Sequence, residues 1–228
     1  MKKEEVLGKL PDLDNVLTPL ERQQVLDEMH VHEYRKNEPI YSEGDRPTHL
    51  LCLISGKVKI YKDGVGGRAQ IVRVVNAVEY FGYRAAFSDE NYVTAAAAFE
   101  SSVIATIPIE LIRQLIMRNP QLAWFFLRRL AIALGKSDAR TVNLTQKHIR
   151  GRLAESILFL KENYGMEEDG QTLSVYPSRE DMANLSNMTT SNAIRTLSVF
   201  AQEGLISLDG RRIKLLNEPA LQKISRMG

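Results

Sequence analysis

Residues 177–206 read PSREDMANLSNMTTSNAIRTLSVFAQEGLI, and this stretch decides the fold of the last quarter of the chain. Ser178 is a favourable N-cap, and Asp181 lies at the third helical position after it, as in a capping box. The buried face of this short first helix carries Met182, Ala183 and Leu185. Residues 186–188 then predict a tight turn before a second helix.

The second helix is predicted to begin at Thr189 or Thr190, since either threonine can cap it. Its inward positions follow helical spacing at Ala193, Leu197 and Phe200. Its outward, N-terminal face carries Thr190, Ser191, Asn192, Ile194 and Arg195. A short helix, a turn and a second helix with a polar outer face form the pattern of a helix-turn-helix, in which the second helix enters the major groove of DNA.

A β-hairpin is predicted directly after the two helices, because Asp209-Gly210 is a strong two-residue turn signal. The hairpin would form the wing of a winged helix. Basic side chains that can meet DNA phosphates gather there and at the start of the first helix: Arg179, Arg211, Arg212 and Lys214. Arg195 is the candidate for a bidentate base contact. The alternative is a small helical core with solvated arginines.

Upstream of residue 177, a third helix is predicted from apolar spacing at Ile149, Leu153, Ile157, Leu158 and Leu160. An acidic turn over 165–170 follows it, and residues 173–176 read as a brief strand. A winged helix-turn-helix domain is therefore expected over 145–228.

A long helix is predicted over 119–144, opened by Asn119-Pro120. Apolar and small residues repeat along it at alternating four- and three-residue steps, which is the coiled-coil period. We expect the helix to pair with a second copy of the chain through Leu127, Leu130, Leu134, Ser137, Thr141 and Leu144. The alternative is that this stripe packs on the helix's own β domain.

The first part of the chain, residues 1–118, is predicted to be a β-roll with flanking helices. Thr18-Pro19 reads as an N-cap followed by proline at the first helical position. From Glu33 to Ile107, short runs rich in Val, Ile, Leu and Tyr alternate with glycine turns, as in a sandwich or jelly roll. The expected fold class is α+β, with a double-stranded β-helix, a long dimerisation helix and a winged helix.

The composition indicates where in the cell the protein is found more clearly than what it does. The chain has 228 residues, a formal net charge of +2 and 44% hydrophobic residues, so a basic surface must be local. The single cysteine, Cys52, excludes an internal disulfide and a four-thiolate iron–sulfur site. The N-terminus has no apolar signal region, and no apolar run is long enough to span a bilayer. We expect a cytoplasmic protein that does not associate with membranes.

The whole chain resembles the Crp/Fnr family of bacterial transcription regulators, from about Thr18 to Leu216. The resemblance rests on Tyr41-Ser-Glu-Gly-Asp, Leu53-Ile-Ser-Gly-Lys-Val-Lys-Ile, Tyr80-Phe-Gly, Ala98-Phe-Glu-Ser-Ser-Val-Ile-Ala-Thr-Ile, and the block from Ser178 to Ile206 with its Asp209-Gly210-Arg wing. It implies a cyclic-nucleotide-binding-type β-roll, a homodimer, double-stranded DNA and RNA polymerase as partners, and no enzymatic activity.

The resemblance also places the DNA contacts. Thr190, Ser191 and Arg195 fall where the family's recognition helix touches DNA, with Thr189 and Asn192 beside them. Many members have glutamate at the position of Ser191, which accepts a hydrogen bond from a cytosine amino group. Serine cannot do this in the same way, so the preferred half-site is expected to differ from the family's commonest one.

The effector pocket departs further from the family pattern. Members that bind cyclic AMP have Gly-Glu and, about ten residues later, Arg-Ser, which contact the ribose and the cyclic phosphate. The corresponding residues here are Gly82-Tyr83 and Tyr92-Val93. Arg84 is in a different register, and Asp138, which follows Ser137 where the family's long helix reaches the nucleotide, would repel a phosphate. We expect no cyclic AMP binding of the familiar kind.

Other functions compare less well with these residues. Haem would need axial ligands from the scattered His30, His32, His49 and His148, from Cys52 or from methionines, and none lies in a metal-binding motif. A cyclic-nucleotide- or haem-binding module acting through a partner protein is the alternative to a DNA-binding regulator. A cupin-like enzyme would need a titratable cluster inside the barrel, where the strands supply only His49 and Cys52.

Overall fold

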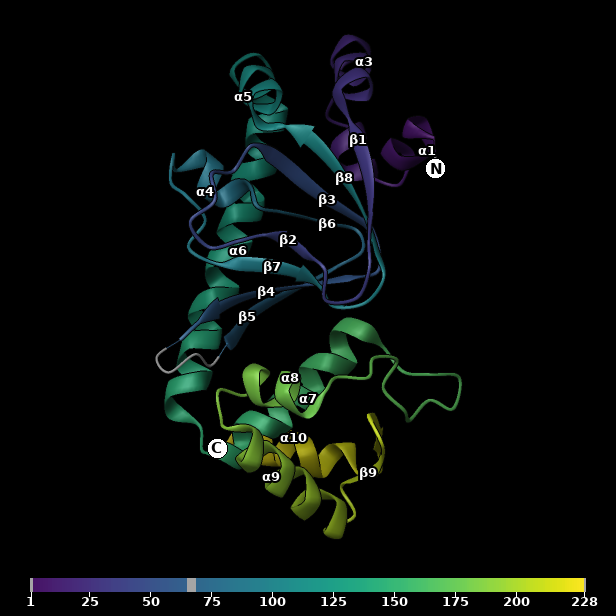
Figure 1. The fold of residues 1–228 in the computed structure, drawn as a ribbon, viewed down its shortest axis with the longest axis vertical. Coiled ribbons are helices and arrows are strands. Elements are labelled where there is room, and N and C mark those ends of the chain that lie inside the picture. The colour runs from purple at the N-terminus through teal and green to yellow at the C-terminus, as the bar shows by residue number, and fades with distance from the viewer. Residues whose placement is uncertain (1, 65–68, 228) are drawn as a thin grey trace. The chain divides into compact units, whose positions relative to one another are not determined.

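The computed structural model describes residues 2–64 and 69–227, with the exception of the side chains of residues 139–140 and 143–145. The described residues form two compact units (Figure 1). The first comprises residues 2–63 and 72–135, and the second comprises residues 64, 69–71 and 136–227.

The first unit is built on two four-stranded sheets. One sheet has the order β1-β8-β3-β6 and the other has the order β2-β7-β4-β5. The strands are β1 (His30–Tyr34), β2 (Pro39–Tyr41), β3 (His49–Ser55), β4 (Lys57–Asp63), β5 (Ala69–Asn76), β6 (Glu79–Phe81), β7 (Ala95–Ala98) and β8 (Ser102–Pro108). Together with its helices, this antiparallel sandwich confirms the predicted mixed fold with a jelly-roll-type first domain.

Strand β3 is buried on both faces, which explains its continuous apolar sequence. Leu50, Cys52 and Ile54 point to the core between the first sheet and the helices. Leu51 and Leu53 point to the core between the two sheets. Because successive strand residues alternate between faces, a single strand supplies both cores.

Helices cover the outer face of the first sheet. They are α1 (Lys3–Gly8), α2 (Pro11–Asp14), α3 (Pro19–Glu28), α4 (Tyr83–Phe87), α5 (Ile109–Arg118) and the first part of α6 (Pro120–Gln146). The predicted Thr18 cap is confirmed: its side chain accepts from the Glu21 amide, and the Glu21 carboxylate accepts from the Thr18 amide. Asn119 begins α6, because its side-chain oxygen accepts from the amides of residues 121 and 122.

The second unit contains a helical core and a short hairpin. Its elements after α6 are α7 (Ile149–Tyr164), α8 (Arg179–Leu185), α9 (Thr190–Gln202), β9 (Ile206–Asp209), β10 (Arg212–Leu215) and α10 (Glu218–Met227). Helix α10 packs on α7, and α8 packs on α9. The strand predicted over 173–176 is reduced to isolated bridges, in which Leu173 pairs with Met166 and Thr172 with Lys214. Among the described residues, no helix is both long and apolar enough to cross a membrane.

Candidate nucleic-acid interface and effector pocket

The two helices α8 and α9 are held together by local capping and by small residues at their contact. The Ser178 hydroxyl accepts from the Asp181 amide, which confirms the predicted capping box. Thr189 caps α9 by accepting from the Asn192 amide at 3.3 Å. Ala183 and Ala193 are buried, so the helices approach closely. Helix α9 is thus a well-defined element whose inner face, including Leu197 and Phe200, is fully buried.

The outer face of α9 carries the side chains that the sequence singled out. Thr190, Ser191 and Arg195 are exposed, and Asn192 is half-buried. The Arg195 guanidinium donates to Asn192 Oδ1 at 2.6 Å. Residues three apart lie on the same side of a helix, so this hydrogen bond can form within α9, and it fixes the direction of the guanidinium.

The basic residues of the wing lie around its turn, and most of them have intramolecular contacts. Arg179 at the start of α8 donates to the Gly210 carbonyl at the hairpin turn, at 2.8 Å. The Arg212 guanidinium lies 5.6 Å from the centre of the Tyr176 ring. Lys214 lies 3.5 Å from the Asp169 carboxylate, and Arg211 is exposed. The structure therefore joins Arg179 to the wing, a connection that sequence spacing does not reveal.

Asp169 organises the turn that leads toward the wing. Its carboxylate accepts from the amides of Thr172 at 2.7 Å and Gln171 at 2.9 Å, and from the Thr172 hydroxyl. These hydrogen bonds, those from the Thr172 and Gln171 amides above all, hold the pKa of Asp169 well below its usual range, and Lys214 adds to the effect. The acidic turn predicted from sequence thus contains one carboxylate with a structural role.

Arg150 holds the C-terminal end of α9. Its guanidinium makes two hydrogen bonds to the Glu203 carboxylate, at 2.9 and 2.6 Å, and lies 5.0 Å from the centre of the Phe200 ring. The hydrogen bond from Arg150 lowers the pKa of Glu203. A planar guanidinium that makes two parallel hydrogen bonds to a carboxylate has a defined geometry, so this ion pair fixes the end of α9 against α7. The sequence gives no signal for this pair, which is 53 residues apart.

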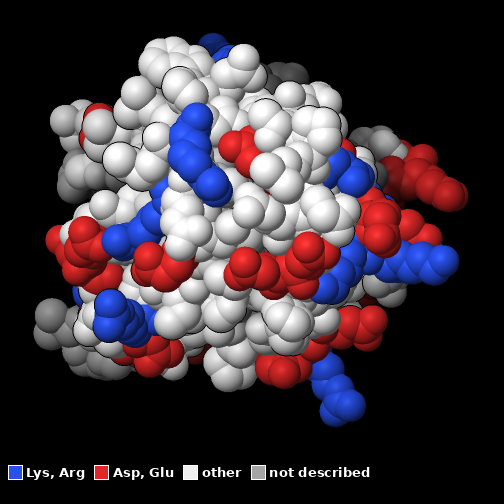
Figure 2. All heavy atoms as spheres, turned by 90° about the horizontal axis from the view of Figure 1, so that it is seen from above, with Lys and Arg blue, Asp and Glu red and all other residues white. Residues whose placement is uncertain are grey.

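Charges of both signs are mixed on one face of the molecule. On the face drawn in Figure 2, basic and acidic side chains are interspersed. With a formal net charge of +2, the chain relies on local basic residues rather than on its overall charge for any attraction to DNA.

Two of the residues predicted to form the effector pocket, Gly82 and Tyr92, do come together. Gly82 has φ +80°, and a Cβ atom built there would lie 2.9 Å from the Tyr92 hydroxyl oxygen. The Tyr92 ring stacks on Tyr41, with centroids 3.8 Å apart. Burial and the neighbouring Tyr41 raise the pKa of Tyr92, so the phenol stays neutral. The space beside Gly82 is therefore bounded by the neutral Tyr92 phenol and the Leu51 side chain.

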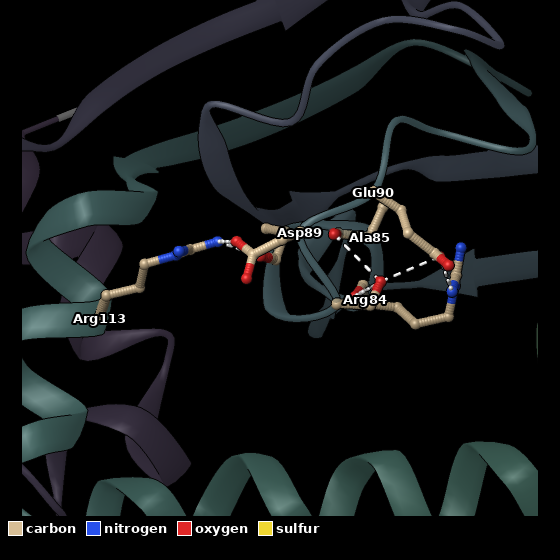
Figure 3. A network of polar contacts seen from close by, with 7 residues as sticks. Arg84, Ala85, Asp89, Glu90 and Arg113 are labelled. Carbon is tan, nitrogen blue, oxygen red and sulfur yellow. Dashed lines mark hydrogen bonds and ion pairs between the residues drawn. The ribbon is translucent and has the colours of Figure 1, made fainter.

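Other residues predicted to form the pocket point elsewhere. Tyr83 is buried in the core, with its ring centroid 5.4 Å from that of Phe126, so it packs toward α6; its role in an effector pocket stays a prediction. Arg84 forms an ion pair with Glu90 at 3.2 Å, in a polar network that includes Asp89 and Arg113 (Figure 3). Val93 is exposed. Ser137 and Asp138 belong to the second unit, so their place relative to the pocket stays a prediction.

Family models match both halves of the chain. The model of the cyclic nucleotide-binding domain matches residues 31–119, and the model of the Crp-like helix-turn-helix domain matches residues 151–224. The chain belongs to the Crp/Fnr family of transcription regulators. Its helix-turn-helix is therefore a DNA-binding one, and the protein is a DNA-binding transcription regulator rather than an enzyme.

Three relatives illustrate the range of this Crp/Fnr family. A CRP-like cAMP-activated global transcriptional regulator from Mycobacterium tuberculosis is 23% identical over 195 residues, covering 85% of this chain and 87% of the relative. FixK2 from Bradyrhizobium japonicum has a TM-score of 0.77 at 22% identity, covering 86% and 96%. The c-di-GMP responsive global regulator CLP from Xanthomonas campestris has a TM-score of 0.76 at 19% identity, covering 87% and 99%.

The long helix α6 of this Crp/Fnr protein has two apolar faces. Leu122 and Phe126 are buried in the core of the first unit, and Leu130 is half-buried against it. Leu130 thus packs in part on its own domain, and its place in a dimer seam stays a prediction. Leu127 and Leu134 are 55% and 64% exposed. Trp124, which lies outside the predicted seam, is 65% exposed. Of the other predicted seam residues, Ser137 and Thr141 are exposed, and the side chain of Leu144 lies outside the described residues.

The predicted haem ligands can also be placed. His30, His32 and His49 line a cleft of about 540 Å³ in the first unit, beside Tyr41 and Tyr92. Burial and the two neighbouring histidines lower the pKa of His49. His148 precedes α7 in the second unit. Within the part of the chain that the structure describes, no three His, Cys, Asp or Glu side chains are arranged to hold a metal ion.

Proposed function

We propose that this Crp/Fnr protein acts as a homodimer that reads a near-palindromic DNA site and that is not controlled by cyclic AMP in the usual way. The observation that carries the proposal is the outer face of α9, where Arg195 is exposed and oriented by Asn192. A bidentate guanidinium is the commonest specific contact to guanine in the major groove. Phosphate contacts from Arg179, Arg211, Arg212 and Lys214 would position the helix without reading sequence.

The proposed dimer is supported by the exposed side of α6. Trp124, Leu127 and Leu134 are large apolar side chains that leave more than half of their surface exposed. Their spacing of three and seven residues fits a paired helix. In a twofold dimer the two recognition helices would lie about one turn of DNA apart, which is why the site is expected to be a near-palindrome.

The proposed independence from cyclic AMP is supported by the chemistry beside Gly82. Binding the cyclic phosphate needs a cation, and the position expected for it holds Tyr92, whose neutral ring stacks on Tyr41. The nearby Arg84 is paired with Glu90. The names of the relatives attach cyclic AMP to one protein and c-di-GMP to another, so family membership alone does not assign an effector. No cofactor is proposed.

RNA polymerase is proposed as a further partner because the relatives are transcription regulators. The cytoplasm is the proposed compartment, since that is where bacterial DNA is accessible.

Selection of bound duplexes from a random DNA pool tests this function. We expect enrichment of a near-palindrome whose half-sites are about one helical turn apart, bound by two copies of the chain. Titration of the enriched duplex at several salt concentrations then separates specific binding from phosphate attraction. Enrichment of no sequence at all would contradict the proposed function.

A further inference from the structure

The outer face of α9 contains an apolar side chain at its centre. Ile194 is 46% exposed. Residues four apart lie in one row along a helix, so Thr190, Ile194 and Ser198 form a row beside that of Ser191 and Arg195. All five of these side chains are exposed. The face that would enter the groove therefore presents a branched aliphatic group flanked by hydroxyls and one guanidinium.

The neighbours of Ile194 are committed to other bonds. The Ser198 hydroxyl donates to the Ile194 carbonyl at 3.0 Å, so it is turned to the helix backbone. Asn192 Oδ1 accepts from Arg195. Ile194 itself has no polar atom in its side chain, so it can recognise a base only through an apolar contact.

The base edges of the major groove offer one apolar group, the C5-methyl of thymine. Single exposed apolar residues are ordinary on protein surfaces, and Ile194 is informative only because of its place on this face. We infer that Ile194 reads a thymine through its C5-methyl group, in the half-site that contains the guanine contacted by Arg195. This inference rests on the proposed function and adds the class of base read beside Arg195.

Replacement of thymine by deoxyuridine tests this contact, because uracil differs from thymine only in lacking the methyl group. Each thymine of the selected half-site is replaced in turn, and affinity is measured at constant salt. Wild-type protein should lose about fourfold in affinity at one thymine, the value expected for one buried methyl group. Ile194→Ala should bind the thymine duplex more weakly and lose this sensitivity to deoxyuridine.

Two further variants serve as controls. Leu216→Ala removes a 51%-exposed aliphatic side chain of the same unit that lies outside α9, and it should keep the wild-type response to deoxyuridine. Ile194→Val, which retains a branched side chain, should keep part of the response. Thermal unfolding of each variant checks the fold.

The inference would be overturned by three results. One is a selected half-site without thymine, and another is an equal response of wild type and Ile194→Ala to every deoxyuridine replacement. The third is the absence of any sequence-specific binding by the wild type, which overturns the proposed function as well. Specific binding with no Ile194-dependent thymine overturns this inference alone.

Discussion

The outer face of α9 and the space beside Gly82 have opposite characters in this protein. On α9, Arg195 is exposed and is oriented by its hydrogen bond to Asn192. The exposed residues around it are uncharged: Thr190, Ser191, Ile194 and Ser198. Beside Gly82, Tyr92 is buried and stacked on Tyr41. The outer face of α9 is open to solvent, whereas at Gly82 the side chains of Tyr92 and Leu51 lie so close that a Cβ atom would collide with them. Under the proposed function, this difference means that the family's DNA-reading element is retained while its effector site has diverged.

The largest expected effect tests whether the open surface needs a second copy of the chain. Leu134→Glu places a charge on the exposed side of α6, where Leu134 is 64% exposed and its loss should not unfold the chain. If α6 forms the dimer seam, the variant should be monomeric and lose about 10²–10⁴-fold in affinity for the palindrome, because two linked half-sites no longer act together.

Sedimentation and DNA titration measure this effect. Leu20→Glu is the matched control, since Leu20 is 70% exposed on α3 and lies outside α6. It should remain a dimer with wild-type affinity. A Leu134→Glu protein that stays dimeric would remove α6 from the interface.

The next effect tests whether the filled space contributes to stability. Tyr92→Ala removes a ring that is 7% exposed and stacked on Tyr41, and it should lower the free energy of unfolding by about 3–5 kcal/mol. Tyr92→Phe keeps the ring and should change it by less than about 1.5 kcal/mol. Chemical denaturation measures both. An alanine variant as stable as wild type would mean that the stack does not pack the site.

Arg195→Ala tests the reading of sequence by the open surface. It should cost about 1–3 kcal/mol on the selected site and much less on random DNA, because a base contact is lost. Arg211→Ala is the contrasting variant, since loss of a phosphate contact should weaken binding to all sequences similarly and reduce the salt dependence. Equal losses on both DNAs for Arg195→Ala would show that this residue contacts the backbone only.

The smallest effect concerns pH and the Asp169 turn. The pKa of Asp169 is lowered in the folded chain, so its hydrogen bonds to Thr172 and Gln171 stabilise the fold fully above the ordinary value of 3.8. That stabilisation is lost progressively as pH falls below this value toward the folded pKa. The free energy of unfolding, measured by chemical denaturation across this pH range, should therefore decrease less steeply toward acid for Asp169→Asn than for wild type. The control Glu168→Gln, in the same turn, should show the same pH dependence as wild type.

Local signals predicted much of the fold. Thr18, Ser178 and Thr189 are helix caps whose bonds are made within three residues, so the chain around them suffices to identify them. The Asp209-Gly210 turn likewise requires only its own backbone, with Gly210 at φ +55°. These signals located α8, α9 and the wing, and with them the candidate DNA contacts.

Contacts between distant residues could not be predicted. The stack of Tyr41 on Tyr92 depends on how two separate segments meet in the β-sandwich, and Tyr83 points into the core because a helical turn follows Gly82. The heptad pattern of α6 does not distinguish the face that packs on the β domain, where Leu130 is half-buried, from the face that carries the exposed Leu127 and Leu134. Spacing along one helix shows that a stripe is apolar, but not which surface covers it.

The most direct test of the account measures binding of the selected palindrome by fluorescence anisotropy, with and without millimolar cyclic AMP, at one salt concentration. Because Tyr92 stands where the phosphate-binding arginine is expected and lies against Gly82, while Arg195 is exposed and oriented by Asn192, the two binding curves should coincide and both should show specific binding. An increase in affinity of about fivefold or more on addition of cyclic AMP would contradict the account, since it would demonstrate coupling between a functional nucleotide pocket and the recognition helix.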